Sequence, residues 1–360
     1  MTAEVLRAAQ EEHRYDVRVG GGVPEALTAL AAEHDRVALV TCSPVRATPF
    51  AKRLERALLA TGRLALVHPL PDGERGKTLA ELERAATRLL RAGATRRTLV
   101  VAVGGGAVTD AAGFLAATYM RGVPWVAVPT TLLAMVDAAL GGKTAVNLPL
   151  AKNAVGAFHP PRAVLADAAA LRTLPARELR SGLGEVVKYG ALRPAILPAV
   201  RAAARSGRAG AALIAACARL KLEVVERDPR EQAERKLLNL GHTFGHGVEA
   251  AGAFRRYTHG EAVAVGLAFA FRLARALGRV DDAAVLALEE VLDLAGLPRR
   301  VPRVLARRAE RLMGYDKKRT EAGLRWVLPR GRGGRWQVEW DVAASPEAVH
   351  AAVGEIGETP

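Results

Sequence analysis

The chain has few of the features that mark secreted or membrane-anchored proteins. It contains two cysteines in 360 residues, Cys42 and Cys217, which lie far apart in the sequence. Such spacing argues against a disulfide framework and fits a reducing cytoplasm. The N-terminal residues include acidic side chains and no apolar core, so no signal peptide is visible. The longest apolar stretch, Trp125–Gly142, contains Pro129 and Asp137 and would span a membrane poorly. We therefore expect a cytoplasmic protein.

Aromatic residues are also scarce, at 4% of the chain, although the net charge is +15. A strong positive charge fits nucleic acid, an acidic surface or an anionic substrate as the partner. No run of Lys and Arg is interleaved with Phe or Tyr, so a nucleic-acid-binding protein is the least favoured interpretation. A salt-dependent shift with duplex DNA would support it. Arginines spread over solvated helix faces account for most of the charge.

The length favours two domains, because 360 residues exceed one ordinary core. Over residues 1–170, strand-like and helix-like segments alternate, which predicts an α/β domain with a Rossmann-like parallel sheet. Over residues 171–360, Ala-rich helical segments dominate, and a small hairpin surrounds Gly331–Gly334, so this domain is predicted to be mostly α-helical. The expected strands of the first domain are Tyr15–Val19, Arg36–Thr41, Leu64–His68, Thr98–Val103 and Trp125–Val128. Its expected helices are Pro24–Ala32, Pro44–Ala60, Thr78–Arg91 and Val108–Tyr119.

Three of the eight histidines fall in one short window of the second half. His242 and His246 are four residues apart, so they share one face of a helix. His259 follows a polar break, after which a second helix can return it to the same point. Neutral imidazoles gathered in this way are typical of a divalent metal site. Because a catalytic metal is expected to take two imidazoles beside a carboxylate, the third imidazole is left for the substrate.

A carboxylate for this site is present in an earlier helical segment. Glu185 and Lys188 are three residues apart on one helical face, a spacing that also fits a surface ion pair. The flanking residues Leu183, Val186 and Val187 indicate a largely buried helix instead. A buried carboxylate needs a cation, and the histidine cluster offers a metal. A Glu, His, His group with an open position is typical of a Lewis-acid zinc site.

The segment VAVGGGAVTD at 101–110 reads as a strand, a glycine turn and a helix. Glycines allow close approach of the backbone to a phosphate, and a helix N-terminus offers free N–H groups, which suits a nucleotide pyrophosphate. The spacing is not G-x-G-x-x-G, and a tight turn between strand and helix explains the segment as well. Asp110 lies at the start of the helix, where it can cap the helix or hold a ribose or nicotinamide group.

The segment GGKT at 141–144 invites a P-loop interpretation, which fails because Asp137 stands where the pattern needs glycine. What remains is a glycine turn that carries Lys143, followed by Asn147, Lys152 and Asn153. Two cations and two amides so close together suit a phosphate or a carboxylate. A polar surface loop is the alternative, and the apolar residues on both sides of the segment weigh against it.

Taken together, these blocks resemble the 3-dehydroquinate synthases, within the wider set of sugar-phosphate cyclases. The matching blocks run in order from about Tyr15 to Leu328: GGGAVTD, RGVPWVAVPTTLLAMVDAALGGKTAVN, KNAVGAFHPP, TLPARELRSGLGEVVKYG, LLNLGHTFGH, HGEAVAVG and a late DKK. The resemblance implies a dehydroquinate synthase-like fold, in which the first domain binds NAD and the second binds metal and substrate. It also implies a phosphate lyase of the shikimate pathway, which serves chorismate and aromatic amino acid biosynthesis.

The resemblance further implies roles for individual residues. The metal, zinc or cobalt, falls on Glu185, His242 and His259. The implied NAD contacts are Glu74, Lys77, Gly105, Gly106, Asp110, Thr130, Thr131, Lys143, Lys152 and Thr173. The implied substrate and catalytic contacts are Asp137, Lys143, Asn153, Lys188, Lys221, Arg235, Asn239, His246 and Lys318. Arg121 matches an arginine that reaches into the neighbouring subunit's site, which implies a homodimer.

The implied substrate is 3-deoxy-D-arabino-heptulosonate 7-phosphate, whose carboxylate and phosphate require the Lys and Arg set. The implied sequence is oxidation by NAD⁺, β-elimination of phosphate, return of the hydride, ring opening and aldol closure to 3-dehydroquinate. Three positions depart from the family pattern: Ala138 replaces a common Ser, Leu148 replaces a usual His, and Asp228-Pro229 replaces a common Asp-Glu. None is a mapped catalytic position, so we expect them to affect only fine geometry.

Two related functions stay open. A sister cyclase would act on sedoheptulose 7-phosphate or glucose 6-phosphate, which lack the carboxylate. The presence of Lys221, Arg235 and His246, which the resemblance ties to the carboxylated substrate, favours the heptulosonate. A metal-dependent alcohol or glycerol dehydrogenase shares the glycine loop and a late pair of histidines. It would release NADH in stoichiometric excess, whereas the cyclase would turn over with catalytic NAD⁺.

Overall fold

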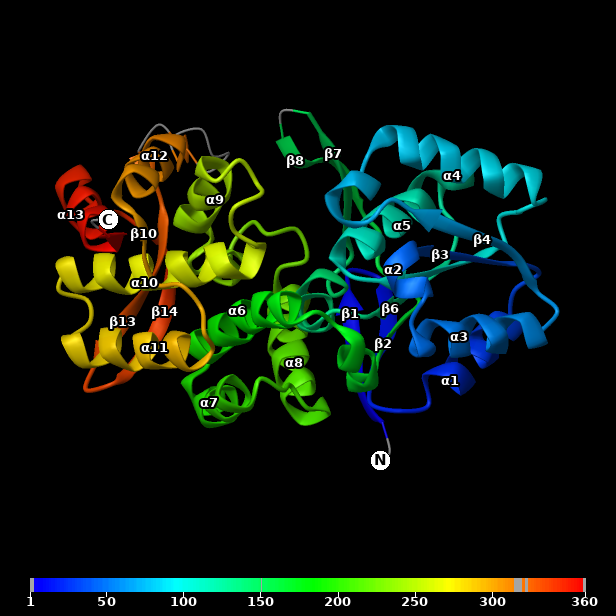
Figure 1. The fold of residues 1–360 in the computed structure, drawn as a ribbon, viewed down its shortest axis with the longest axis horizontal. Coiled ribbons are helices and arrows are strands. Elements are labelled where there is room, and N and C mark those ends of the chain that lie inside the picture. Colours follow the sequence, from blue (N-terminus) through cyan, green and yellow to red (C-terminus); the bar gives the residue numbers. More distant parts are fainter. Residues whose placement is uncertain (1–2, 150, 314–318, 321–322, 359–360) are drawn as a thin grey trace. The chain divides into compact units, whose positions relative to one another are not determined.

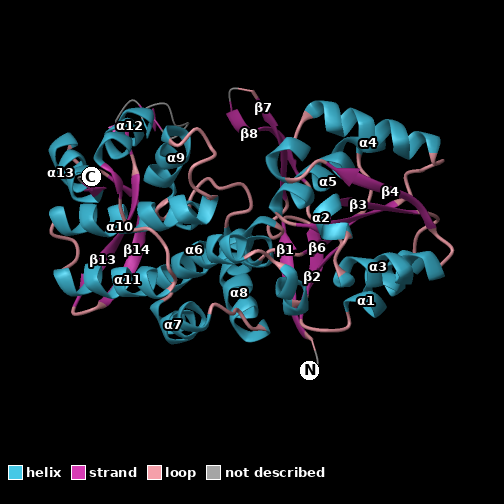
Figure 2. Ribbon diagram, in the orientation of Figure 1, coloured by secondary structure: helices cyan, strands magenta, loops and turns pink. Residues whose placement is uncertain are grey.

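The computed structural model describes residues 3–149, 151–313, 319–320 and 323–358. The chain divides into two compact units. Unit 1 comprises Met1–Pro175 and Gly210–Glu226, and unit 2 comprises Ala176–Ala209 and Arg227–Pro360. Unit 1 contains a mostly parallel sheet with helices, and unit 2 is mostly helical (Figures 1 and 2). The predicted fold class is therefore confirmed.

Unit 1 is built on a seven-stranded sheet with the order β1-β2-β9-β6-β5-β3-β4. The strands are β1 (Glu4–Gln10), β2 (His13–Val19), β3 (Val37–Cys42), β4 (Leu64–Leu70), β5 (Leu99–Gly104), β6 (Trp125–Pro129) and β9 (Ala163–Ala166). β1 pairs antiparallel with β2, and the other neighbours pair in parallel. Every residue of β3, β5, β6 and β9 is buried, as expected for parallel strands that are covered on both faces.

The order of the strands reverses beside β5. From β3 the chain proceeds to β4 on one side and then returns to β5 on the other side of β3. At such a reversal the connections leave the carboxyl ends of the two strands in opposite directions, which opens the usual ligand position of an α/β sheet. The carboxyl end of β5 is Gly104, and α5 (Gly106–Thr118) begins two residues later. The glycine turn recognised in the sequence therefore lies at this position.

Helices and one hairpin complete unit 1. The helices are α1 (Val23–Ala32), α2 (Ser43–Arg46), α3 (Pro49–Ala60), α4 (Leu79–Arg91), α5 and α8 (Ala211–Arg227), and the hairpin consists of β7 (Lys143–Leu148) and β8 (Ala151–Phe158). The expectation of one helix over Pro44–Ala60 was wrong. Thr48 interrupts it, because its hydroxyl accepts the Ala51 N–H and caps a new helix that starts at Pro49. Neither β1 nor the β7–β8 hairpin was predicted from the sequence.

Unit 2 is a helical assembly around a buried central helix. Its helices are α6 (Ala176–Leu192), α7 (Leu197–Ser206), α9 (His242–Ala251), α10 (His259–Ala276), α11 (Asp282–Leu294), α12 (Arg303–Met313) and α13 (Pro346–Ile356). Residues 262–274 of α10 are all buried, and α10 packs against α6, α9, α11 and α13. The predicted hairpin is present as β13 (Trp326–Arg332) and β14 (Arg335–Val342). Short paired strands are β10 (Val301–Pro302) with β15 (Gly357–Glu358) and β11 (Arg319–Thr320) with β12 (Gly323–Leu324).

One helix departs from the division expected at residue 170. Gly210–Glu226 belongs to unit 1 by packing, although it follows two helices of unit 2. Its side chains Arg219 and Lys221 form ion pairs with Glu4 and Asp137 of unit 1. The assignment of NAD binding to residues 1–170 and of metal and substrate binding to residues 171–360 stays a prediction.

Two further expectations concern cysteines and membranes. Cys42 and Cys217 are both buried, and neither forms a disulfide. Among the described residues, no helix has both the length and the apolar character that crossing a bilayer requires.

Candidate metal centre and active site

Two helices of unit 2, α6 and α10, touch through their backbones. A Cβ atom added to Gly260 would lie 1.7 Å from the carbonyl oxygen of Ser181, and one added to Gly184 would lie 2.3 Å from the carbonyl oxygen of Gly260. The Gly260 N–H donates a hydrogen bond to the Ser181 hydroxyl at 3.1 Å. Because no side chain fits at either glycine, the sequence itself sets the close crossing of α6 and α10.

The third helix, α9, meets α10 in a similar way. A Cβ atom on Gly266 would lie 1.8 Å from the carbonyl oxygen of Gly241. Gly241 caps α9 with a φ of 79°, a left-handed conformation that favours glycine. His242, the next residue, is thereby fixed as the first residue of α9, directly against α10.

The start of α10 is set by a capping box. The Thr258 hydroxyl accepts the Glu261 N–H, and the Glu261 carboxylate accepts the Thr258 N–H. His259 is consequently the first residue of α10. Glu185 lies in the middle of α6, where the segment 181–191 is entirely buried. Three side chains from three helices therefore project into one region of unit 2.

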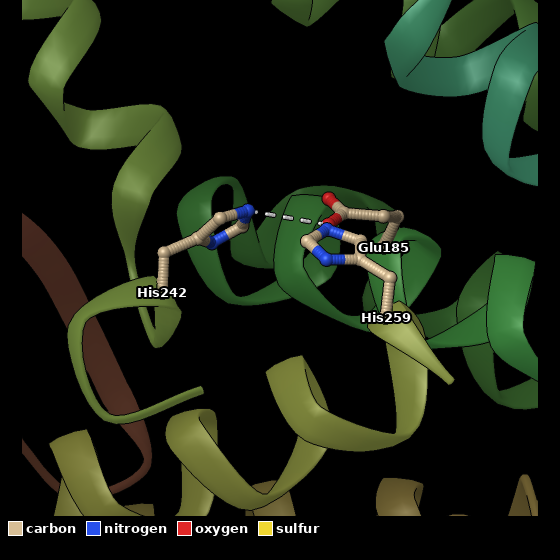
Figure 3. Close-up of side chains that lie close together, drawn as sticks. All are labelled: Glu185, His242 and His259. Carbon is tan, nitrogen blue, oxygen red and sulfur yellow. Dashed lines mark hydrogen bonds and ion pairs between the residues drawn. The ribbon is translucent and has the colours of Figure 1, made fainter. Parts of the chain in front are cut away.

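Figure 3 shows Glu185, His242 and His259 directed toward one another. Their nearest ligand atoms all lie within 4.8 Å of one another. The Nε2 atom of His259 is 3.2 Å, and the Nε2 atom of His242 is 3.5 Å, from the same carboxylate oxygen of Glu185. Two ligands about 2.1 Å from a tetrahedral zinc ion lie about 3.4 Å apart. The donor set and its spacing therefore fit a divalent ion such as zinc or cobalt.

The charges around this group are buried and balanced. The Glu185 side chain is 0% exposed, and the Lys188 ammonium, 1% exposed, pairs with its second oxygen. Burial alone would lower the pKa of His259, but hydrogen bonds and charges from Glu185 and Glu249 outweigh it and raise that pKa to about 10. The pocket thus favours a positive charge at His259, a preference that a divalent ion bound to the neutral imidazole also satisfies.

The far nitrogens of the two imidazoles have separate partners. His242 Nδ1 lies 3.2 Å from the carbonyl oxygen of Leu240, and His259 Nδ1 lies 3.4 Å from a carboxylate oxygen of Glu249. Each Nδ1 can therefore carry the ring proton, which leaves the Nε2 lone pairs facing Glu185. His246, one turn along α9, is exposed, and its ring centroid lies 5.5 Å from that of His242. It sits beside the group rather than in it.

A second polar cluster lies in unit 1, near the carboxyl end of β5. The Lys77 ammonium donates to the Asp110 carboxylate at 2.6 Å and to the Asn153 side-chain oxygen at 2.5 Å. Burial raises the pKa of the Asp110 carboxyl, and the Lys77 charge opposes that shift. Lys77 itself is buried, and these two oxygens accept hydrogen bonds from its ammonium group.

The β7–β8 hairpin joins this cluster to the segment around Glu74. Asn147 donates to the Glu74 carboxylate at 2.6 Å, and its oxygen accepts the Asn153 N–H at 2.9 Å. The Lys152 ammonium lies 3.9 Å from Glu74. Asn153 has a φ of 53°, in the left-handed region that asparagine tolerates better than most residues. The amides of the hairpin therefore bring together residues that the sequence spreads over 80 positions.

The glycine turn contacts the loop that follows β6. The Thr130 N–H donates to the Gly104 carbonyl at 2.9 Å, and a Cβ atom on Gly105 would lie 2.8 Å from the Thr131 methyl group. A Cβ atom on Gly106 would lie 3.1 Å from Ala138. Gly105, Gly106, Thr130 and Thr131, the predicted NAD contacts, thus lie close together at the N-terminus of α5.

Asp137 and Lys221 form a further pair in unit 1. The Lys221 ammonium donates to the Asp137 carbonyl at 2.6 Å and to its carboxylate at 2.8 Å. Asp137 belongs to a π-helix, Ala134–Ala138, a local distortion that is frequent at functional sites. Both residues were predicted substrate contacts, and the structure brings them together.

The segment before α9 holds two more predicted residues. The Asp228 carboxylate accepts three backbone N–H groups, including that of Arg235. Burial would raise the pKa of Asp228, but these hydrogen bonds keep it below its usual value. Arg235 is buried and donates to the Pro229 carbonyl at 2.5 Å, and Asn239 donates to Glu231 at 2.5 Å. The Asp228-Pro229 departure therefore lies in the loop that positions Arg235.

Comparison with known protein families shows to which family the chain belongs. Residues 67–181 match the 3-dehydroquinate synthase N-terminal domain, and residues 182–319 match the 3-dehydroquinate synthase C-terminal domain. The chain belongs to the 3-dehydroquinate synthase family. A 3-dehydroquinate synthase from Xylella fastidiosa is 45% identical to it over 358 residues, which cover 95% of each protein. The predicted family is confirmed.

Solved structures of sister enzymes have the same fold. A 2-epi-5-epi-valiolone synthase from Streptomyces hygroscopicus with NAD⁺ and Zn²⁺ bound has a TM-score of 0.82 and 28% identity, and the match covers 97% of this chain and 98% of that one. A 2-deoxy-scyllo-inosose synthase complexed with carbaglucose-6-phosphate, NAD⁺ and Co²⁺ has a TM-score of 0.80 and 26% identity, with coverage of 98% and 100%. The fold of this 3-dehydroquinate synthase family member is thus shared with sugar-phosphate cyclases.

The positions of four further residues expected from the 3-dehydroquinate synthase resemblance are as follows. Lys143 is exposed at the start of β7, and Arg121 is exposed beyond α5 with a φ of 67°. Thr173 is exposed, and its hydroxyl faces the carbonyl of Ala170 at 3.5 Å. Lys318 lies outside the described residues.

Sequence reasoning passed over Glu249, whose carboxylate contacts His259 from α9. Its spacing from His242 is seven residues, two helical turns along one face, so the pattern was available as a signal. It also passed over Glu231, which contacts Asn239 across a loop and left no such signal in the sequence.

Proposed function

We propose that this member of the 3-dehydroquinate synthase family converts 3-deoxy-D-arabino-heptulosonate 7-phosphate to 3-dehydroquinate and phosphate. The buried group of Glu185, His242 and His259 is the observation that carries this proposal, because its donors and spacing suit a Lewis-acid ion. Similarity also favours this reaction over those of the sister cyclases, since the 45% identity to a 3-dehydroquinate synthase exceeds the 28% and 26% found for the two cyclase structures.

The metal would be held by Glu185, His242 and His259. Once bound, a zinc or cobalt ion would supply a positive charge that acidifies the substrate hydroxyl to be oxidised. Lys188 would hold the second oxygen of Glu185 in place, so that the first stays directed toward the two imidazoles. The Lys188 ammonium would also contribute positive charge beside an anionic substrate.

The NAD-binding surface would be formed in unit 1. NAD would take up a hydride from the substrate and later return it, so that it is regenerated. The glycine turn would let the pyrophosphate approach the N-terminus of α5, and Lys77 and Asp110 would hold polar groups of the dinucleotide. The full set proposed for NAD is Glu74, Lys77, Gly105, Gly106, Asp110, Thr130, Thr131, Lys143, Lys152 and Thr173.

The substrate carries a carboxylate and a phosphate, which together need several cations. The chain offers the buried cations Lys188, Lys221 and Arg235, which would supply positive charge to such an anion. The full set proposed for the substrate is Asp137, Lys143, Asn153, Lys188, Lys221, Arg235, Asn239, His246 and Lys318. By orienting both anionic ends, these side chains would fix the reacting carbons relative to the nicotinamide ring.

His246 is proposed to transfer a proton at the substrate rather than to bind the ion. Its exposed imidazole lies next to the His242 ring but outside the group of three ligands. We expect His246→Ala to keep its zinc and to lose turnover. Zinc content by atomic absorption, measured beside the rate of phosphate release, tests this assignment, and loss of the zinc would contradict it.

One assay tests the reaction itself. Purified protein is incubated with the heptulosonate phosphate and catalytic NAD⁺, with and without a chelator, and phosphate release is measured. We expect turnover in excess of the NAD⁺ present, lost with the chelator and restored by zinc. Parallel reactions with sedoheptulose 7-phosphate and glucose 6-phosphate should release little phosphate. Preference for either would indicate a sister cyclase, and stoichiometric NADH from an alcohol such as glycerol would indicate a dehydrogenase.

We also propose a cytoplasmic homodimer in which Arg121 serves the second copy's active site. Its exposed position and left-handed backbone support this role, because such strain persists where the surrounding structure requires it. Coexpression of Arg121→Ala with His246→Ala provides the test. Mixed dimers regain one intact site if Arg121 acts across the interface and none if it acts within its own chain. Light scattering of the purified protein measures the oligomeric state.

A further inference from the structure

Glu249 lies directly behind one of the two imidazoles. Its side chain is 6% exposed on α9, and its carboxylate oxygen is 3.4 Å from His259 Nδ1. The opposite ring nitrogen, Nε2, is 3.2 Å from Glu185. A neutral imidazole has one N–H and one lone pair, so only one of its nitrogens can donate a hydrogen bond. The positions of the two carboxylates therefore decide which nitrogen of a neutral His259 carries the proton and which keeps a lone pair.

We propose that Glu249 is a positioning residue for the metal site, which accepts the Nδ1–H of His259 and holds the Nε2 lone pair toward the ion. This inference rests on the proposed function, since it requires that Glu185, His242 and His259 bind the metal. A carboxylate behind a histidine ligand fixes the ring orientation and increases the basicity of the ligating nitrogen. Glu249 thus acts on the ion through His259 and touches neither ion nor substrate.

The two imidazoles are not equivalent in this arrangement. His242 Nδ1 faces a neutral backbone carbonyl, that of Leu240, whereas His259 Nδ1 faces a charged carboxylate. His259 is therefore the stronger donor to the ion. Glu249 also shares α9 with His242, so one rigid helix carries one ligand and the support of the other. Gly245 of α9 packs closely on the backbone of Ala262 of α10, so the two helices approach each other directly beside these ligands.

The charge of Glu249 also offsets that of Lys188. The buried Lys188 ammonium pairs with Glu185 and thereby weakens the negative field that Glu185 presents to an ion. A second buried carboxylate restores that field. Without Glu249, a divalent ion and the buried Lys188 ammonium would share one carboxylate. We therefore expect both the orientation and the charge of Glu249 to strengthen metal binding.

Two substitutions separate these contributions. Glu249→Gln keeps an oxygen that can accept the Nδ1–H but removes the charge, and Glu249→Met removes both at similar volume. Glu289→Gln is the matched control, because Glu289 is also buried in unit 2 but pairs with Arg272 and Arg299, away from the metal group. The dissociation constant for zinc is measured by competition with a chromogenic chelator, and cobalt-loaded protein gives a visible spectrum that reports ligand geometry.

We expect zinc affinity to fall in the order wild type, Glu249→Gln, Glu249→Met, with a loss of roughly 10- to 100-fold for the methionine variant. The cobalt spectrum should change in the same order. Glu289→Gln should unfold more easily in denaturant but keep the wild-type zinc affinity and cobalt spectrum. A folded Glu249→Met protein with wild-type affinity and spectrum would overturn the inference.

Zinc binding by the wild type and by His259→Ala distinguishes a failure of this inference from a failure of the proposed function. If the wild type binds zinc tightly and His259→Ala does not, the three-ligand site stands, and the Glu249 variants alone decide the inference. If His259→Ala binds zinc as the wild type does, the proposed metal site fails, and the role of Glu249 fails with it. Should Glu249→Gln not fold, Glu249→Met still gives the decisive comparison.

Discussion

The candidate metal group of unit 2 and the polar cluster of unit 1 are built in different ways. Glu185, His242 and His259 come from three helices, which cross at glycines with their backbones in contact. Lys77, Asp110 and Asn153 come from a turn, a helix and a hairpin, and they meet only through side chains. An ion requires ligands at nearly fixed distances, which rigid helices provide. A dinucleotide is held by many separate hydrogen bonds, which side chains on loops can supply.

Histidines in the two units illustrate the same contrast. In unit 1, burial and the charges of Arg88 and Arg84 lower the pKa of His68 to about 4. In unit 2, the carboxylates of Glu185 and Glu249 overcome burial and raise the pKa of His259 to about 10. Unit 1 therefore keeps a histidine neutral by burying it beside cations, while unit 2 gathers negative charge where a metal ion can replace a proton.

The largest effect is expected when a metal-binding side chain is removed from the site in unit 2. We expect His242→Ala to lose zinc and to lower turnover by roughly 10³-fold, because several kcal/mol of charge stabilisation disappear. Binding of NAD⁺ should stay unchanged if the two sites are built independently. Isothermal titration with NAD⁺, beside zinc analysis and phosphate release, checks all three. An equal loss of NAD⁺ affinity would show that the two sites depend on each other.

The next largest effect is expected when a glycine at the crossing of two helices is replaced. In Gly260→Ala the new methyl group would overlap the Ser181 carbonyl, so α6 and α10 must separate. We expect a loss of about 1–3 kcal/mol of stability together with weaker zinc binding. Gly354→Ala is the control, since a Cβ atom there meets nothing within 4 Å in the helix α13. It should gain about 0.5–1 kcal/mol and leave zinc binding unchanged. Denaturant unfolding and chelator competition measure both.

The reciprocal test replaces a side chain of the polar cluster in unit 1. Lys77→Met removes hydrogen bonds to a charged and a neutral oxygen, so we expect NAD⁺ affinity to fall roughly 10- to 100-fold. Zinc affinity should not change. Arg75→Met is the matched control, because Arg75 is an exposed cation two residues away in the same turn. If both variants lose NAD⁺ affinity equally, general positive charge rather than the Lys77 contacts explains the binding.

The smallest effect is a pH dependence that arises in unit 1. Burial lowers the pKa of His68 in the folded protein to about 4, below its ordinary value of 6.5, so the unfolded chain binds more protons between these pH values. The stability that a neutral His68 contributes is complete above pH 6.5 and decreases as the pH falls toward 4. Between about pH 7.5 and about pH 5.5 the loss should be about 1 kcal/mol.

His68→Asn provides the comparison, because asparagine offers Arg88 an oxygen in place of the His68 nitrogen and does not titrate. The variant should lose about 1 kcal/mol less stability than the wild type over the same pH range. Denaturant unfolding at both pH values measures this difference. An identical pH dependence in the two proteins would show that His68 is not held neutral by the fold.

Much of the candidate site could be predicted from local sequence. His242 and His259 each begin a helix, and the signals for these starts, a left-handed glycine and a capping box, are local. Glu185 was recognisable because apolar neighbours marked its helix as buried. In contrast, Asn147 and Asn153 meet Glu74 and Lys77 only through the β7–β8 hairpin. No hydrophobic periodicity predicted that hairpin, and the residues that its asparagines contact lie about 70 residues away in the chain.

By itself, the sequence determined the kind of chemistry and the order of the elements. Hydrophobic periodicity, helix caps and residue type act over a few neighbouring positions, and the family resemblance supplied the expected roles. Tertiary structure decided which side chains meet: that Lys221 of α8 joins Asp137 in unit 1, and that Glu249 stands behind His259. These contacts depend on how closely packed elements approach one another, a property of the whole unit that no short segment contains.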